Sequence, residues 1–371
     1  MRNLSLLSLI PLSLLLASPS LADRIFKTDG STLDDVTIVS EGLDEVEYKP
    51  SKGRKKKTIG SHEVLSIVFE KMPPQIDSAE VAVDNELYLD AVNDLEEFLD
   101  RFSKKGPRTY PWAVPYALYR LVEVYQVAGE YPLVVTAADR VLAEAPSSRY
   151  AILAHLTKIE ALHLMGDDAA LKSSVAAFST FVKDHSLPAR WRLEAELRGV
   201  LFDSSLKGSK RRDKLNDVVS AAGKTSPIVK NRAMVAIGES FLKERKVGDA
   251  ERMFNKVLGD PKADNFTLAG AHTGLGDCLY QKAEKVQSEG DDDEAAAGFK
   301  TASLEYMRVV VVYGDQVQYV PKAMFYAGRC FQELGDSENE RRAQKLYGKL
   351  VRTYPSSKAA KEAKSFRRRA Q

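Results

Sequence analysis

The amino-acid sequence predicts a mainly α-helical protein, an α-solenoid of about seven helix pairs that follows a small β-rich domain. Three observations carry this prediction. Small residues recur among large apolar ones at the spacing of a helix–turn–helix unit of about 34 residues, which cannot bury its own apolar face. Short β-branched and aromatic runs, separated by turn residues, precede these units. Stacked repeats also explain a length of 371 residues without several independent cores.

The repeat pattern is strongest at 115–146, 231–262 and 321–355. Two helices of a unit cross closely only where the contact point lacks bulk, so Gly238 is predicted to face Ala250. Large apolar residues at i, i+3, i+4 and i+7 fill the rest of the contact, and a proline ends the second helix. The residues predicted to build the repeats are Gly238, Ala250, Phe254, Gly276, Gly328, Tyr347, Pro146 and Pro355.

These residues resemble tetratricopeptide repeats, and the resemblance covers most of residues 75–355. It implies a right-handed stack of helix pairs that binds a protein partner on a concave wall formed by the first helix of each pair. In such repeats the second, fifth, ninth and twelfth positions of the first helix point into that wall. The resemblance therefore assigns partner binding to Tyr116, Tyr119, Glu123, Glu160, Glu239, Asp277, Tyr280, Phe325 and Arg329.

The ninth position of the first helix is acidic in four units, at Glu123, Glu160, Glu239 and Asp277. A row of carboxylates favours a partner with Lys or Arg spaced along it, and tyrosines beside the row offer broad contact area. The alternative is that a solvent-facing helix position is polar without binding anything. Both interpretations stay open at this point.

Residues 1–22 are predicted to be a cleaved signal peptide. Arg2 precedes an apolar run, and Ser20-Leu21-Ala22 is a small-x-small cleavage site. The run is too short to span a membrane. We expect a mature chain that begins at Asp23 in a bacterial periplasm, without a lipid anchor, because no cysteine follows the apolar run.

Residues 23–72 are predicted to form a small β domain and residues 73–371 the helical repeat domain. Turn signals at Asp29-Gly30 and Lys52-Gly53 separate β-rich runs, which favours a small five-stranded barrel that loosely resembles SH3-like or Sm-like modules. The basic run 54–57 is either a hairpin tip for an anionic partner or a charged loop that protects an edge strand. The β-rich runs are 24–27, 36–39, 46–48 and 65–69.

The sequence offers little catalytic chemistry, so the protein is not predicted to be an enzyme, and no metal or cofactor is expected. His62-Glu63 lacks the second histidine of a zinc helix, and Ser204 to Lys207 matches an S-x-x-K spacing without the other motifs of that site. The acidic cluster 291–294 lacks the alternating ligands of a calcium loop, which favours an acidic linker between lengthened helices.

Cys278 and Cys330 occupy the same place in their repeats. A disulfide between adjacent first helices is one interpretation, since an oxidising compartment would permit it. The favoured one is two small residues buried between helices, because disulfide geometry is strict.

The charge balance argues against a general nucleic-acid binder, because Lys and Arg total 54 and Asp and Glu total 52. From Arg341 to the end, however, eleven Lys or Arg residues accompany a single acidic one, Glu362. The favoured interpretation is a solvated helix that caps the last apolar face of the stack. The alternative is attraction to an anionic surface.

The stretch from Tyr354 to Ala360, which ends one helix and opens the next, is similar to the repeat domains of the Tol-Pal-associated cell-division coordinator and outer-membrane assembly lipoprotein families. The resemblance implies a periplasmic scaffold for envelope proteins, in envelope biogenesis or division. The chain departs from the first family by having β structure in place of a coiled coil, and from the second by lacking an anchor cysteine. Two alternatives are a tether to lipid or cell wall through the basic C-terminus, and an accessory or inhibitory subunit of a periplasmic enzyme.

Overall fold

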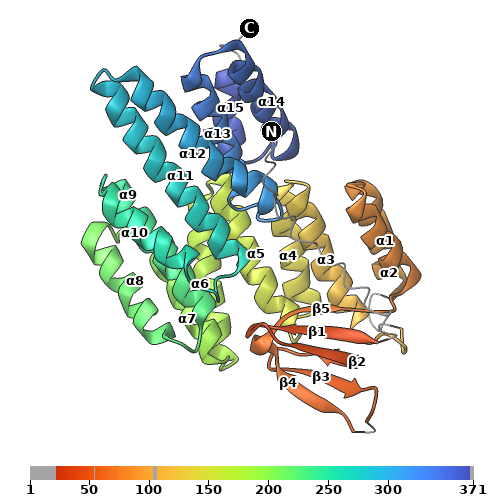
Figure 1. Cartoon of the computed structure of the whole chain (residues 1–371). Coiled ribbons are helices and arrows are strands. Elements are labelled where there is room, and N and C mark those ends of the chain that lie inside the picture. Colours follow the sequence, from red (N-terminus) through yellow and green to blue (C-terminus); the bar gives the residue numbers. More distant parts are fainter. Residues whose placement is uncertain (1–21, 54, 103–106, 368–371) are drawn as a thin grey trace, which may run out of the picture.

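The structure is a computed structural model that describes residues 22–53, 55–102 and 107–367. Within these residues a five-stranded sheet precedes fifteen α-helices (Figure 1). The predicted signal peptide lies almost wholly outside the described residues. Across the described part, no helix combines the length and apolar character needed to cross a membrane.

The β domain is an antiparallel sheet in which the first strand pairs with both the second and the last. The expected turns are present: the amide of Gly30 donates to the Lys27 carbonyl, and the amide of Gly53 donates to that of Pro50, each at 3.1 Å. The strand order is β4-β3-β2-β1-β5, which confirms the five strands expected. The strands are β1 (Asp23–Lys27), β2 (Thr32–Glu41), β3 (Glu45–Pro50), β4 (Lys57–Gly60) and β5 (Val64–Val68).

The helices form seven consecutive pairs, followed by one further helix, in the described residues. Each packs against the next along the chain, and first helices of neighbouring pairs also meet, for example α9 with α11. They are α1 (Pro74–Asp84), α2 (Tyr88–Phe102), α3 (Ala113–Val127), α4 (Tyr131–Glu144), α5 (Arg149–Met165), α6 (Asp168–Asp184), α7 (Ala189–Phe202), α8 (Gly208–Ala222), α9 (Pro227–Lys243), α10 (Val247–Leu258), α11 (Asn265–Ser288), α12 (Asp292–Val312), α13 (Val320–Leu334), α14 (Ser337–Thr353) and α15 (Lys358–Arg367).

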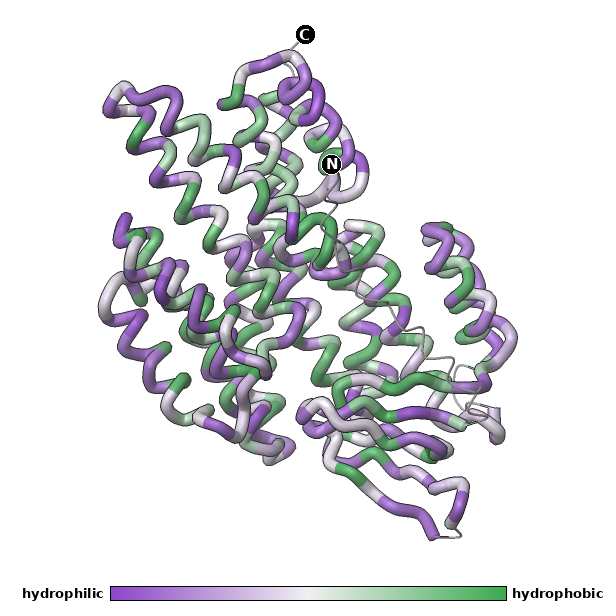
Figure 2. The backbone as a smooth tube through the Cα atoms, viewed as in Figure 1, coloured by the Kyte–Doolittle hydropathy of each residue, from purple (hydrophilic) through white to green (hydrophobic). Residues whose placement is uncertain are grey.

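Helix lengths and ends follow the sequence closely. Along each helix hydrophobic and hydrophilic residues are interspersed (Figure 2), as expected when one stripe packs on neighbours and another meets solvent. Pro146 and Pro355 both lie just beyond the last residue of a second helix, as predicted. The pair around the acidic linker is lengthened as expected, since α11 has 24 residues and α12 has 21.

Glycines of the first helices pack against aromatic rings of the second helices. A Cβ on Gly238 would lie 2.6 Å from a ring carbon of Phe254, so the ring of Phe254 requires the glycine. The same relation joins Gly276 to Tyr306 and Gly328 to Tyr347. The predicted close crossings are therefore present, and their physical reason is space for a ring.

The β domain is fixed to the helices by buried polar contacts. The guanidinium Nε of Arg149, at the start of α5, lies 2.6 Å from the Glu41 carboxylate, whose side chain is 1% exposed. The Tyr150 hydroxyl donates to the same carboxylate at 2.9 Å. Nearby, the ring of Phe69 stacks on that of Trp112 at 3.5 Å between centroids. Domain and stack thus form a continuous packed unit.

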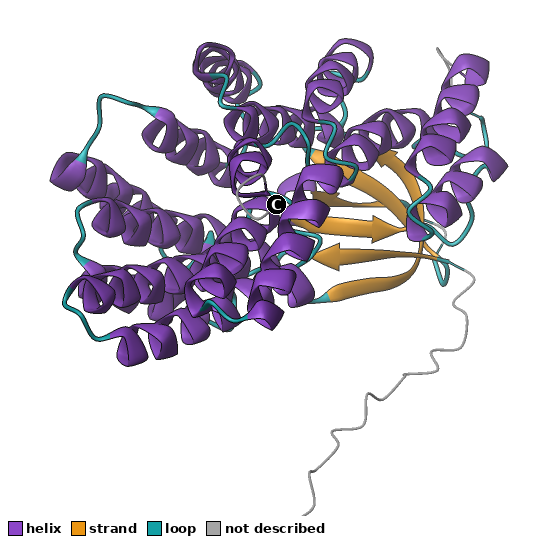
Figure 3. Cartoon of the chain, turned by 90° about the horizontal axis from the view of Figure 1, so that it is seen from above, coloured by secondary structure: helices purple, strands orange, loops and turns teal. Residues whose placement is uncertain are grey.

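The second helix pair also touches the last pair. Gly129, in the turn between α3 and α4, packs against the backbone of Thr353 and Tyr354 at the end of α14, and a Cβ there would overlap the Thr353 carbonyl. Tyr131 and Tyr354 are both buried in one continuous core cluster. Seen from above, helices curve around the C-terminal end of the chain (Figure 3). The solenoid therefore curves back far enough for its second pair to meet its last pair.

The last helix caps the stack. Ala360 and Ala363 of α15 are fully buried, and the ring of Phe366 lies 5.5 Å from that of Phe325. This placement agrees with the capping interpretation of the basic C-terminal segment. Cys278 and Cys330 are free thiols, and both are buried, in two different core clusters.

Candidate binding groove

Two adjoining cavities, of about 630 and 510 Å³, open along the inner wall of the stack. They form one continuous groove, which we call the inner groove, because nine residues line both cavities. These come from the first helices α5, α9 and α13, from the loop before α13, and from α15. The shared residues are His163, Glu239, Lys243, Gln318, Tyr319, Lys322, Phe325, Tyr326 and Glu362.

Six of the nine residues predicted to bind a partner line this groove. Their positions in the repeat pattern were enough to place these six residues on the inner wall, because the first helix of each pair faces inward over most of the stack. The six are Glu160, Glu239, Asp277, Tyr280, Phe325 and Arg329.

The other three predicted residues lie on α3, away from the groove, and serve internal packing. Tyr116 donates its hydroxyl to Glu80 at 2.8 Å and packs edge-on against Phe69 of the β domain. Tyr119 is buried, with its hydroxyl 3.1 Å from that of Thr157. Glu123 is held by Arg120 at 3.0 Å. Tyr116 and Tyr119 are therefore engaged inside the fold, and Glu123, whose side chain is 39% exposed, lies outside the groove.

The predicted acidic row is mostly neutralised by internal ion pairs. Glu160 meets Arg198 at 2.8 Å, and Asp277 meets Lys322 at 2.6 Å while accepting a hydrogen bond from Tyr306 at 2.8 Å. Of the four carboxylates in the row, Glu239 is therefore the one without an internal hydrogen-bond or ion-pair partner in the described residues.

An arginine–carboxylate ladder crosses the inner wall from α5 to α11. Arg198 bridges Glu160 and Glu194, and Arg232 continues from Glu194, at 2.8 Å, to Asp264, at 3.5 Å. Burial raises the pKa of Glu194, but Arg232 and Arg198 outweigh burial and hold that pKa below its usual value. The ladder fixes the spacing of four successive first helices.

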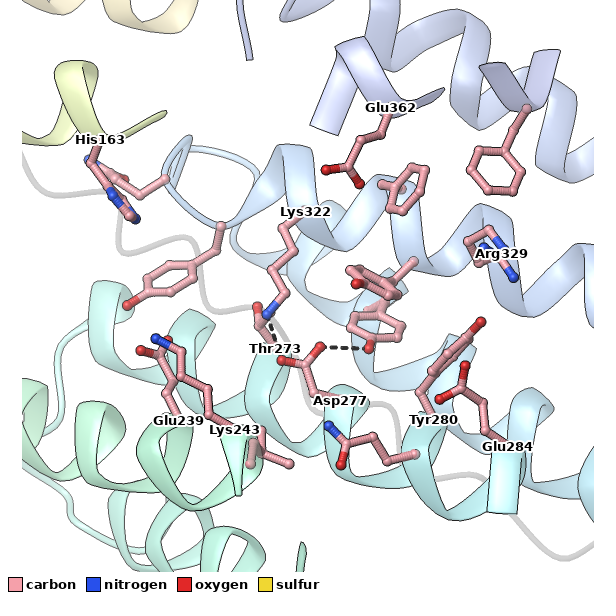
Figure 4. Close-up of a pocket in the computed structure, with 18 residues that line it drawn as sticks. His163, Glu239, Lys243, Thr273, Asp277, Tyr280, Glu284, Lys322, Arg329 and Glu362 are labelled. Carbon is pink, nitrogen blue, oxygen red and sulfur yellow. Dashed lines mark hydrogen bonds and ion pairs between the residues drawn. The ribbon is translucent and has the colours of Figure 1, made fainter. Parts of the chain in front are cut away.

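Carboxylates without an ion pair remain inside the larger cavity. Glu239, Glu284 and Glu362 have no ion-pair partner in the described part of the chain, and they reach the cavity from α9, α11 and α15 (Figure 4). One ammonium there, that of Lys243, is also without a carboxylate partner. Asp277 and Glu239 outweigh the effect of burial and hold the pKa of Lys322 above its usual value. The free charge of this cavity is therefore negative.

Sequence reasoning missed Glu284 and Glu362. Glu284 lies beyond the twelfth position of its helix, in a stretch that exists only because α11 is lengthened. Glu362 belongs to the capping helix, which turns into the groove. That both side chains are exposed and face Glu239 across the cavity becomes visible only in the folded chain, so the sequence pattern could not reveal it.

Comparison with known proteins supports the repeat assignment. Residues 322–357, which cover α13 and α14, match the tetratricopeptide repeat family. The solved structures that the chain resembles include yeast Tom70 (13% identity, 80% of this chain and 68% of that chain, TM-score 0.24). Another is the tetratricopeptide domain of P58(IPK) (12% identity, 79% of this chain and 88% of that chain, TM-score 0.23). A search of curated proteins by sequence gives no match.

The protein is thus a solenoid of tetratricopeptide-like helix pairs preceded by a small antiparallel β domain, and residues 322–357 match the tetratricopeptide repeat itself. This fold is typically a non-catalytic scaffold for protein partners. In the part of the chain that the structure describes, no group of three or more His, Cys, Asp or Glu side chains is arranged to hold a metal ion.

Proposed function

We propose that this protein is a non-enzymatic scaffold that holds a segment of an envelope protein in its inner groove. The single observation that carries the proposal is the set of unpaired carboxylates, Glu239, Glu284 and Glu362, around one cavity of about 630 Å³. Glu239 is half-buried and Glu284 and Glu362 are exposed, so all three can meet a ligand, and carboxylates that converge on a concave site without an ion pair favour a partner of opposite charge.

The partner segment is proposed to carry Lys or Arg. Its cationic groups meet the three carboxylates, and its apolar parts meet the aromatic walls supplied by Tyr280 and Phe325. This keeps the basic partner that the repeat pattern suggested but moves its recognition to a different set of carboxylates.

The proposed compartment is a bacterial periplasm, and the proposed process is envelope biogenesis or division. Support comes from the sequence of residues 1–22, which has the order of a signal peptide. A mature N-terminus at Asp23, together with release of the protein by osmotic shock, is the expected result. An N-terminus at Met1 in a cytoplasmic fraction would refute this compartment.

In-cell photo-crosslinking tests the groove. A photo-reactive residue in place of Gln281, which lines the cavity, is expected to capture a protein through a segment containing Lys or Arg. The same residue in place of Lys300, exposed on α12 and outside the groove, serves as the control.

Charge reversal makes the test specific. The triple variant Glu239→Lys, Glu284→Lys and Glu362→Lys is expected to lose the adduct at position 281 while keeping the helical circular dichroism spectrum. Equal adducts at 281 and 300, or an unchanged adduct in the folded triple variant, would overturn the proposal.

A further inference from the structure

The two ends of the inner groove carry opposite charge. The residues that line only the larger cavity, here called the acidic end, include two acidic side chains and one basic one. The residues that line only the smaller cavity, here called the basic end, include one acidic side chain, Glu160, and four basic ones. The four are Arg198, Arg211, Arg232 and Lys358.

Internal ion pairs leave this polarity in place. At the acidic end, Asp277 is paired with Lys322, and Arg329 with Glu333 at 3.1 Å, so Glu284 supplies the free charge. At the basic end, Arg198 and Arg232 belong to the ladder described above.

Two cations at the basic end make no ion pair in the described residues. Arg211 donates to the carbonyls of Leu201 and Asp203, each at 3.0 Å, and the Asp203 carboxylate acts on it only from a greater distance. Lys358 is exposed, and within the described residues it makes no ion pair. The free charges of the groove therefore run from negative near α11 to positive near α8 and the start of α15.

In the described residues, the middle of the groove combines aromatic rings with the unpaired carboxylates of Glu239 and Glu362 and the unpaired ammonium of Lys243. Tyr319, Phe325 and Tyr326 line both cavities, and Phe325 is buried in the packing around α13. An apolar side chain of a ligand that packs against these rings is removed from water, which favours binding. The groove thus runs from an acidic end, through a middle with aromatic rings and a net negative free charge, to a basic end.

We infer that the inner groove binds a mixed-charge segment in one orientation. The segment carries Lys or Arg over the acidic end, an aromatic or large aliphatic residue in the middle, and Asp or Glu over the basic end. The reversed placement puts like charges together at both ends and is disfavoured. This inference rests on the proposed function and adds the order of charges that the partner must carry.

Two single charge reversals test the orientation. Glu284→Lys changes the acidic end, and Lys358→Glu changes the basic end. Both are exposed, and both reversals suit the helix dipole, because Glu284 lies near the C-terminal end of α11 and Lys358 is the first residue of α15. Glu196→Lys and Lys361→Glu, exposed residues outside the groove, are the matched controls.

The probe is a displayed library of random linear peptides, selected on the purified mature protein and on each variant. Wild type and both controls are expected to enrich peptides that contain Lys or Arg on one side of an aromatic or aliphatic residue and Asp or Glu on the other. Glu284→Lys is expected to lose the enrichment for Lys and Arg only, and Lys358→Glu the enrichment for Asp and Glu only. For a selected peptide, each reversal weakens binding about fivefold.

Failure of the inference differs from failure of the proposed function. Selected peptides that bind in the groove but show no ordered charges, or that respond equally to both reversals, overturn the orientation alone. A library that yields no peptide competing with the adduct at position 281 overturns the scaffold and the orientation together.

Discussion

At the scale of single residues, Phe254 shows how neighbouring repeats are joined. Its ring packs against Gly238 of its own pair on one side and against Gly274 of the following pair on the other. A single aromatic side chain therefore couples α9, α10 and α11. Because protein interiors are close-packed, such a contact leaves no room for an added methyl group.

Gly238→Ala is expected to destabilise the protein by about 1–2 kcal/mol, since overpacking against the Phe254 ring outweighs the better helix propensity of Ala. Gly348→Ala is the control. That glycine lies inside α14 with no atom near a Cβ, so the substitution is expected to stabilise by up to about 1 kcal/mol. Urea unfolding of both variants measures the difference, and equal effects would contradict the packing argument.

His155 makes the stability of the folded protein depend on pH. Burial, with a smaller effect of Lys158, lowers its pKa to about 4, while an unfolded histidine titrates near 6.5. The unfolded state therefore binds a proton first as the pH falls, so stability is full above about 6.5 and decreases towards pH 4, by about 3 kcal/mol. His155→Gln is expected to flatten this part of the stability profile. An unchanged difference between pH 7 and pH 4.5 would show that another group is responsible.

The sequence could locate Glu160 and Asp277 on the inner wall but could not reveal that they are neutralised. Their partners, Arg198 and Lys322, lie on other helices, and the distance between side chains depends on how adjacent pairs stack. Local pattern fixes which face a residue takes. It does not fix which charge lies opposite.

At the scale of elements, the β domain behaves as part of the stack. Four strands can be predicted from β-rich runs and turn signals in the sequence. The fifth, β4, begins in the lysine-rich segment and has no apolar pattern from which to predict it. The helices follow from apolar periodicity. The contact between Glu41 and α5 joins residues more than a hundred positions apart, which no local signal predicts.

Glu41→Ala is expected to destabilise the protein by about 3–5 kcal/mol, because the Arg149 charge remains buried without a partner. Glu47→Ala, which removes an exposed partner of Lys56, is expected to cost less than about 1 kcal/mol. Hydrogen exchange of β2 and β3 measures whether the β domain loosens first. Equal protection in both variants would contradict the docking role of Glu41.

At the scale of the whole molecule, the way the stack curves back on itself depends on Gly129. This glycine has φ of +75° and lies against the Thr353 carbonyl, so it needs both a left-handed backbone and the absence of a Cβ. The contact brings the second pair against the seventh. It was not predictable from repeat spacing, because it depends on the accumulated rotation of successive pairs.

Gly129→Ala is expected to separate the second pair from the last and increase the radius of gyration measured by small-angle X-ray scattering. Gly166→Ala is the control, since Gly166 has φ of +76° with open space around it. Both substitutions cost about 1 kcal/mol for the left-handed backbone, but only the first adds a clash. Equal radii for the two variants would show that this contact does not hold the two pairs together.

The rigid docking of the β domain has a mechanical consequence. The β3–β4 hairpin projects away from the helices (Figure 1), and its base is fixed through the Glu41 contacts. The hairpin is therefore held at a set distance from the inner groove. A partner that contacted both the hairpin and the groove would gain avidity, because the two contact points do not move independently and little entropy is lost in aligning them. Such a partner would need two contact points of its own at the same separation.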